Sequence, residues 1–261
     1  MINSEETVKN IEAVMKDKEL LKLSNEWLHT VLKFNYVNNF TWLGRPIIQI
    51  PQDIYAMQEL IWKVKPDLII ETGIAHGGSI IMSASMLALL DYCEGYSIDD
   101  PSGREVIGID IEIRPHNRMA IEQHRLSHKI TMIEGSSVNN NIIEQIEKIV
   151  DYHKGYDSNG KQQLNSNVMV FLDSNHTHKH VLSELEAYTP FVTVGSYCVV
   201  WDTGIADSLV QNTNRPWGKG NNPRTAVYEF LRSRDDFEID NIISYKLLAT
   251  ASIDGFLKRV K

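Results

Sequence analysis

The stretch Leu68–Ser79, which reads LIIETGIAHGGS, decides the fold of this 261-residue chain. A short apolar run leads to Glu71 and then to a turn that contains Gly73, Gly77 and Gly78. Glycine permits a tight turn and a close approach of the backbone, and the N–H groups of a helix that starts there suit a phosphate or a carboxylate. The spacing matches neither GxGxxG nor a Walker loop, so a plain strand–helix turn stays open as the alternative.

The alternation of short apolar runs and helical stretches continues along the chain. Strands are expected at Leu68–Ile70, Val106–Ile109, Ile130–Ile133, Val168–Leu172 and Tyr197–Val200. Helices are expected between them, at Ser79–Leu90, His116–His124, Asn139–Val150 and His180–Tyr188. This pattern predicts an α/β fold with a parallel sheet covered on both faces. Three last strands, with no helix between them, are expected at Phe237–Ile239, Lys246–Ala251 and Gly255–Val260, and an antiparallel pair would close the sheet.

The N-terminal quarter of the chain has a different character. Residues 1 to about 34 show helical spacing of apolar residues, and Ile54–Val64 shows it again. Between them, the aromatic and proline-punctuated segment Phe34–Asp53 is expected to pack on or over a site. We therefore expect residues 1–64 to form a helical extension with a connecting segment, and residues 65–261 to form the α/β domain.

Composition narrows the class of protein. With 26 basic and 34 acidic side chains the net charge is −8, which argues against a nucleic-acid binder that works by bulk charge. Cys93 and Cys198 form no CxxC pair, and the polar N-terminus is no signal peptide, so a cytoplasmic protein is expected. The longest apolar stretch, Ile80–Leu90, is too short to span a membrane.

Polar side chains follow the first three expected strands. The C-terminal ends of parallel strands meet at one edge of a sheet, where ligands bind. Ser79 starts the helix after the glycine turn, and Asp110 ends the second strand, where an acid can accept hydrogen bonds from both ribose hydroxyls. Ser136 and Ser137 follow the third strand and could line an adenine pocket. Each has a structural alternative, namely the capping of the next helix.

The fourth and fifth strands end in Asp173 and Asp202, and His176, His178 and His180 follow the first of them. Two adjacent carboxylates at a cleft repel each other unless a cation or a proton lies between them. Oxygen ligands suit Mg²⁺, and a histidine can act as a general base near neutral pH. A polar helix start and a lone aspartate that caps a turn are the alternatives.

The segment Arg215–Arg224, RPWGKGNNPR, carries hydrogen-bond donors and an aromatic side chain. Such a loop is typical of a site for a sugar or a phosphate ester. The alternative is an exposed loop whose Trp217 packs down on the protein.

Three stretches together resemble the cephalosporin hydroxylase / rhamnosyl O-methyltransferase family: ETGIAHGGS, GIDIEIRPHNR and LDSNHTHKHVLSELEAYTPFVTVGSYCVVWDT. The resemblance runs from about Trp42 to the C-terminus. It implies a Rossmann-like class I methyltransferase fold that binds S-adenosylmethionine (SAM), with a mostly parallel seven-stranded sheet and antiparallel C-terminal strands. It also implies methyl transfer to a sugar hydroxyl in surface polysaccharide biosynthesis. A nucleotide-linked hexose or heptose is the expected acceptor.

A weaker resemblance to the metal-dependent catechol O-methyltransferases implies the roles of individual residues. It implies that SAM is bound by Glu71, Gly73, Ala75, His76, Gly77, Ser79, Asp110, Ser136, Ser137 and Asp173. It implies that Asp173 and Asp202 hold Mg²⁺ or Mn²⁺ and that His176, with Asp173, is catalytic. The remaining ligand position of that pattern is occupied by Trp201, which cannot bind a metal ion, so His176 or His178 is an alternative ligand.

The acceptor is expected to contact Trp201, His178, Arg215, Trp217 and Arg224, and related enzymes imply a homo-oligomer. Three alternatives remain open. A non-haem iron oxygenase would need two histidines and one carboxylate, which His176, His178 and Asp173 could supply. A nicotinamide-dependent sugar enzyme is disfavoured by the turn and by the long gap to Asp110. A SAM-binding protein without catalysis would agree with Trp201.

Overall fold

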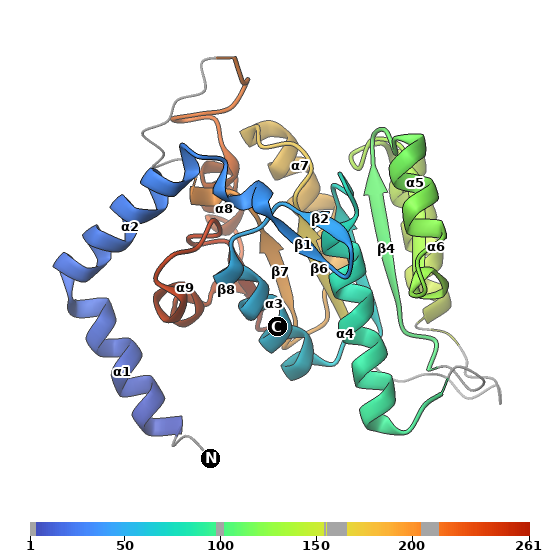
Figure 1. The fold of residues 1–261 in the computed structure, drawn as a ribbon, viewed down its shortest axis with the longest axis horizontal. Helices are drawn as coiled ribbons and strands as arrows, with labels where there is room; N and C mark the ends of the chain where they lie inside the picture. The colour runs from blue at the N-terminus through green and yellow to red at the C-terminus, as the bar shows by residue number, and fades with distance from the viewer. Residues whose placement is uncertain (1–3, 98–101, 154, 156–165, 205–213) are drawn as a thin grey trace.

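A mostly parallel, seven-stranded sheet forms the centre of the part of the chain that the structure describes. The computed structural model describes residues 4–97, 102–153, 155, 166–204 and 214–261. Within them the strand order is β5-β4-β3-β6-β7-β9-β8, with β9 antiparallel to both of its neighbours (Figure 1). The strands are β3 (Leu68–Thr72), β4 (Glu105–Asp110), β5 (Ile130–Glu134), β6 (Val168–Leu172), β7 (Tyr197–Val200), β8 (Phe237–Ile239) and β9 (Phe256–Arg259). The expected fold class is confirmed.

Helices cover both faces of the sheet, because successive strand side chains point to opposite sides. In β3, Ile69 joins one buried apolar layer, while Leu68 and Ile70 join the other. The first layer contains residues of α3 (Pro51–Val64), α4 (Gly78–Glu94) and α5 (Pro115–Glu122). The second contains residues of α6 (Asn140–His153), α7 (His178–Tyr188) and α8 (Pro223–Leu231). Short 3₁₀ helices lie at η2 (Ser127–Lys129) and η3 (Thr189–Phe191).

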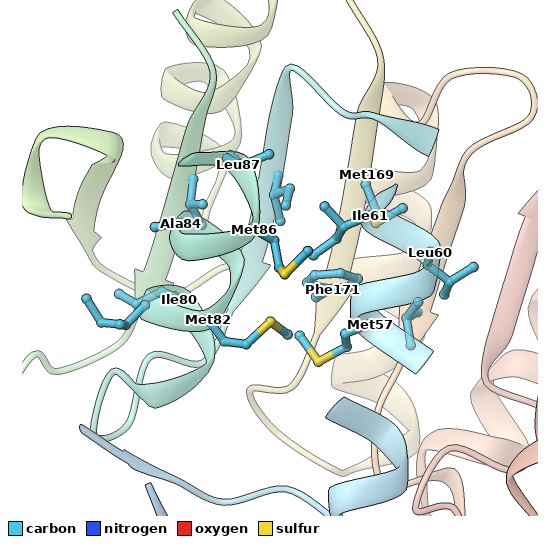
Figure 2. Close-up of a cluster of buried hydrophobic side chains, with 14 of the residues drawn as sticks. Met57, Leu60, Ile61, Ile80, Met82, Ala84, Met86, Leu87, Met169 and Phe171 are labelled. Carbon is cyan, nitrogen blue, oxygen red and sulfur yellow. The ribbon is translucent and has the colours of Figure 1, made fainter. Parts of the chain in front are cut away.

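Methionine side chains fill much of the layer between α3 and α4. Figure 2 shows Met57 of α3 beside Met82 and Met86 of α4, with Met169 and Phe171 of β6 behind them. Met is unbranched and polarizable, so it fills irregular gaps between elements that cross at different angles. Helix α3 is therefore part of the main core, although it precedes the first strand of the sheet.

The N-terminal segment forms two helices rather than one. Helix α1 (Ser4–Lys16) ends before Asp17, and the Asp17 side chain accepts hydrogen bonds from the first turn of α2 (Lys18–Leu32). Such an N-cap starts a new helix, so the single helix expected over residues 1–34 is divided. A 3₁₀ turn, η1 (Tyr36–Asn39), and an antiparallel hairpin of β1 (Phe40–Trp42) and β2 (Arg45–Ile47) then lead into α3.

The C-terminal region corrects one expectation. Helix α9 (Asn241–Leu247) begins where only strands were expected, and residues 246–251 form no strand. Ile243 and Leu247 are one helical turn apart and both pack on the main core, which explains the helix. Figure 1 shows α9 beside α1, and the two helices are in contact. Among the described residues, no helix has the length and apolar character to cross a membrane.

The ends of the parallel strands lie flush at one edge of the sheet. Thr72 pairs with Leu172, which in turn pairs with Val200. The peptide N–H of Asp173 donates to the carbonyl of Thr72 at 2.9 Å. The residues that follow these strands are thereby brought to one place, as the strand pattern predicts.

Candidate functional site

The glycine turn after β3 is built around a buried acid. Glu71 accepts a hydrogen bond from the hydroxyl of Ser79, and its second oxygen has no partner among the described residues. Burial raises the pKa of Glu71 to about 8. Gly73 has φ +92°, and a methyl group on its Cα would lie 2.7 Å from the carbonyl carbon of Asp173. Only glycine allows the two loops to approach this closely.

Two polar side chains from outside the turn hold its shape. Arg45 of the β1–β2 hairpin donates from Nε and Nη2 to the carbonyl of His76, at 3.0 and 2.7 Å. Asn117 of α5 donates to the carbonyl of Ala75 at 2.8 Å and accepts from Arg45 at 2.8 Å. Gly77 has φ +84° and precedes α4, whose N-terminus therefore opens beside the turn. Sequence reasoning did not identify Arg45 and Asn117.

Asp110 closes the turn from the side of β4. Its Oδ2 accepts from the backbone N–H groups of Ile74 and Ala75, at 2.9 and 3.0 Å, and its Oδ1 accepts from Glu112 N at 3.2 Å. The side chain that was predicted to bind the ribose thus organises the turn. Asp110 is half-buried, and its role toward the ribose stays a prediction.

The serines after β5 lie at the same edge of the sheet. Ser137 is buried, its hydroxyl lies 3.1 Å from Nε2 of His180, and its carbonyl accepts from the hydroxyl of Tyr188 at 2.8 Å. The same His180 nitrogen lies 3.1 Å from the hydroxyl of Ser174, so this histidine connects the loops after β5 and β6. Ser136 is half-buried. The adenine role predicted for both serines stays a prediction.

Asp173, His176 and Asp202 form a cluster where β6 and β7 end. Nε2 of His176 lies 3.5 Å from Oδ1 of Asp173, and Nδ1 lies 3.4 Å from Oδ2 of Asp202. One possible ligand atom from each of the three residues lies within 4.8 Å of the corresponding atoms of the other two. Gln49, which follows the hairpin, donates to Oδ2 of Asp173 at 3.3 Å. The segment Phe34–Asp53 therefore does pack on the site.

The acids at the cluster lie close together, and their charges and partial burial shift pKa values. Burial, with the charge of Asp202, raises the pKa of Asp173 to about 7. Burial alone would lower the pKa of His176, but Asp202 and Asp173 outweigh it and raise that pKa to about 9. Burial also raises the pKa of Asp53, a further acid near the cluster, to about 7. Two half-buried acids, Asp173 and Asp202, thus lie against one imidazole, and their charges also act on the buried Asp53.

The donor set fits a divalent cation. Nδ1 of His176 is buried and makes no well-aligned hydrogen bond with a described residue, although Asp202 is near. Carboxylate oxygens suit Mg²⁺ and Mn²⁺, and a cation between Asp173 and Asp202 would relieve their repulsion. Acids with perturbed pKa values that gather in this way make the cluster a candidate functional site.

The predicted acceptor residues divide into two groups. The ring of Trp217 lies 4.9 Å from the ring of His176, edge to face, and the guanidinium of Arg215 lies 5.0 Å from the centre of Trp217. These two residues lie beside the cluster. His178 faces away: its Nδ1 is 2.7 Å from the hydroxyl of Thr225 and its Nε2 is 3.2 Å from Glu229 of α8.

Arg224 is likewise bonded away from the cluster, to Asp254 at 2.7 Å and to the hydroxyl of Tyr228 at 2.9 Å. The expectation for Trp201 is wrong. It is 2% exposed and lies in the core between Phe171 and Phe256, so its ring cannot stack on a sugar. Side chains alternate along β7: Cys198 and Val200 belong to the second apolar layer, whereas Trp201 points the other way, into the first layer.

Comparison with known proteins agrees with this geometry. Residues 34–260 match the family model described as Rhamnosyl O-methyltransferase/CmcI. A rhamnosyl O-methyltransferase of Mycobacterium leprae is 28% identical over 227 residues, 86% of each chain. One of Mycobacterium bovis is 25% identical over 231 residues, 86% of this chain and 82% of its own. A solved CmcI structure described as Mg-SAM shares the fold, with a TM-score of 0.54 and 16% identity over 86% of this chain and 78% of its own.

The family match covers most of the chain and includes every strand of the sheet together with the residues at their ends. The glycine turn, Asp110 at the end of β4 and the cluster of Asp173, His176 and Asp202 lie where this fold class binds its ligands. The chain belongs to the rhamnosyl O-methyltransferase/CmcI family.

Proposed function

We propose that this SAM-dependent O-methyltransferase transfers the methyl group to a hydroxyl of a sugar, with a nucleotide-linked hexose or heptose as acceptor and a divalent cation at the site. One observation carries the proposal. The glycine turn touches the backbone of Asp173, and the carboxylate of the same residue belongs to the cluster with His176 and Asp202. A methyl donor at the turn and a hydroxyl at the cluster would therefore be neighbours, and such positioning supplies ~7–11 kcal/mol of a barrier.

The residues divide the chemical work. Glu71, the glycine turn and Asp110 would bind SAM, whose sulfonium carries an electrophilic methyl group. Asp173 and Asp202 would hold Mg²⁺ or Mn²⁺, which supports a developing alkoxide as a Lewis acid. A cation held by Asp173 and Asp202 would offset the charges that raise the pKa of His176, so the imidazole would be neutral. It would then accept the hydroxyl proton at Nδ1, while Asp173 orients the ring from the side of Nε2.

The surroundings of the cluster support a sugar acceptor. Trp217 offers an aromatic face, and Arg215 brings a positive charge next to it. An aromatic ring suits the apolar face of a sugar, and a guanidinium suits a phosphate. The structure gives no support to the iron oxygenase, because His178 points to α8 and leaves one histidine in the cluster.

A binding titration with S-adenosylhomocysteine, the demethylated product, tests the cofactor. We expect micromolar binding, and its absence would overturn the proposal. A screen of sugar nucleotides for methyl transfer, with Mg²⁺ and after exhaustive chelation, then tests acceptor and cation. Full activity after chelation would remove the cation from the proposal and leave methyl transfer in place. Asp173→Asn is expected to abolish turnover, with the exposed Asp235→Asn as its control.

The homo-oligomer stays a proposal. Trp27 of α2 and Phe34 after it are exposed apolar side chains on the N-terminal segment, and contact with a second copy would bury them. Light scattering at several protein concentrations measures the state directly.

A further inference from the structure

Asp53 is a buried acid that none of the roles above uses. It lies at the third position of α3 and is 0% exposed. The charges that act on it are those of Asp202 and Asp173, which places its carboxylate near theirs. A carboxylate this deeply buried is rare in proteins unless it has a partner.

One oxygen of Asp53 supports the turn that carries Asp202. Oδ2 accepts from the backbone N–H of Ala251 at 2.9 Å. The carbonyl of Ala251 accepts in turn from the N–H of Gly204 at 2.9 Å and from the hydroxyl of Thr203 at 3.4 Å. Asp53 is thus linked, through the backbone of Ala251, to the two residues that follow Asp202.

That turn holds Asp202 in an unusual conformation. Asp202 has φ +56°, in the left-handed region, which residues other than glycine adopt uncommonly and at a cost that is smaller for aspartate than for most. Such strain persists only where the surrounding contacts enforce it, and it concentrates at functional sites. The contacts from Asp53 through Ala251 are therefore part of what directs the Asp202 carboxylate toward His176.

The Thr250 side chain acts on the carboxyl of Asp53, but it makes no well-aligned hydrogen bond with the other oxygen. Oδ1 is buried and has no hydrogen-bond partner among the described residues. Asp53 lies outside the group whose ligand atoms are within 4.8 Å of one another, so it is too remote to join them on one ion. Mg²⁺ and Mn²⁺ keep several water ligands, and a water on the cation needs an acceptor of this kind.

We propose that Asp53 is a positioning residue of the cation site: it fixes the Asp202 turn through Ala251 and accepts a hydrogen bond from a water ligand of the cation. The inference rests on the cation in the proposed function. It gives the site a third carboxylate, which comes from the segment before the sheet. The carboxylate of Asp53 would supply negative charge near the cation, which Trp201, at the remaining ligand position of the pattern, cannot supply.

Mn²⁺ binding measured by electron paramagnetic resonance tests this role without any assay of activity. Asp53→Asn keeps the shape and an acceptor for Ala251 N–H but removes the charge, and Asp53→Ser is a second uncharged variant that keeps an oxygen. Loss of an outer-shell partner weakens metal binding by about 10–100-fold. We expect that loss for both variants, with S-adenosylhomocysteine affinity within twofold of wild type. Glu59→Gln removes one charge from the exposed side of the same helix and is the control.

The outcomes are distinct. Mn²⁺ affinity within threefold of wild type in either folded variant would overturn the inference. A parallel loss of Mn²⁺ binding, cofactor-product binding and thermal stability would also overturn it, because a purely structural role would then suffice. A wild-type protein that binds S-adenosylhomocysteine but no Mn²⁺ would refute the cation in the proposed function, and this inference with it.

Discussion

Replacing Gly73 with alanine should cost free energy of folding in two ways, through the left-handed backbone conformation and through a close contact with Asp173. Gly73 has φ +92°, and its added methyl would lie 2.7 Å from the carbonyl carbon of Asp173. Gly195 has φ +87°, but no atom of the described residues lies within 4 Å of a methyl placed there. Gly195→Ala therefore measures the conformational cost alone, and Gly73→Ala measures that cost together with the contact.

The magnitudes follow from these geometries. A left-handed alanine costs about 1–2 kcal/mol, and the stiffer unfolded chain returns about 0.4–1 kcal/mol, so Gly195→Ala should destabilise by about 1 kcal/mol. Carbon atoms pack at about 3.5–4.0 Å, so in Gly73→Ala the ends of β3 and β6 must separate by about 1 Å. Such overpacking costs typically 1–3 kcal/mol more. We expect a total of about 2–4 kcal/mol.

Urea unfolding of both variants measures these free energies, and calorimetry with S-adenosylhomocysteine measures the site. The movement of Asp173 should weaken binding at least tenfold in Gly73→Ala and leave it unchanged in Gly195→Ala. Equal destabilisation of the two variants, within about 0.5 kcal/mol, would refute the close approach of the two loops. Unchanged cofactor-product affinity in Gly73→Ala would refute the role of the turn.

Three further predictions concern single residues. Trp201→Glu should unfold the protein or cost more than about 4 kcal/mol in urea, because it buries a charge between Phe171 and Phe256; a stable variant with tighter Mn²⁺ binding would refute this. The pKa of Glu71 is raised to about 8 from an ordinary value of 4.5, so the folded state holds the extra proton and stability should fall as pH rises between these values, by up to about 1.4 kcal/mol per pH unit. Glu71→Gln should remove that part of the slope in urea titrations at pH 5.5 and 8, and an unchanged slope would contradict the assignment. Arg45→Ala should weaken S-adenosylhomocysteine binding about tenfold, because the His76 carbonyl loses both hydrogen bonds from Arg45. The exposed Arg125→Ala is the control and should not change the affinity. Equal affinities of the two variants would show that the hydrogen bonds from Arg45 are not needed for binding.

The sheet could be predicted from the sequence because its signals are local. Each parallel strand is an apolar run, and each is followed by a polar residue that the register brings to a common edge, as Asp173 and Asp202 show. The last helix could not be predicted in this way. Ile243 and Leu247 have the spacing of a helix, but the surrounding β-branched and apolar residues also suit a strand, and packing decides between them.

The sequence predicted those residues of the candidate site that directly follow a strand, and it did not predict the residues that other segments contribute. His176 was expected beside Asp173, whereas His178, two positions later, turns to α8 because it begins a helix. Trp201 follows a strand as Asp173 does, but its ring enters the core, and only the three-dimensional packing reveals this. Arg45, Gln49 and Asp53 come from a segment distant in sequence, so no local pattern assigns them to the site.

The hairpin of β1 and β2 has a consequence for how the molecule responds to stress. Arg45 of the hairpin donates a hydrogen bond to the His76 carbonyl of the glycine turn, and Gln49, four residues later, donates one to the carboxylate of Asp173. Gly78, the first residue of α4, packs against the backbone of Ile47 in the same hairpin. The glycine turn and Asp173, the proposed places of methyl donor and acceptor, thus both depend on this hairpin and the residues directly after it. A protease cut, a partner or an inhibitor that displaces the hairpin would therefore disrupt both at once.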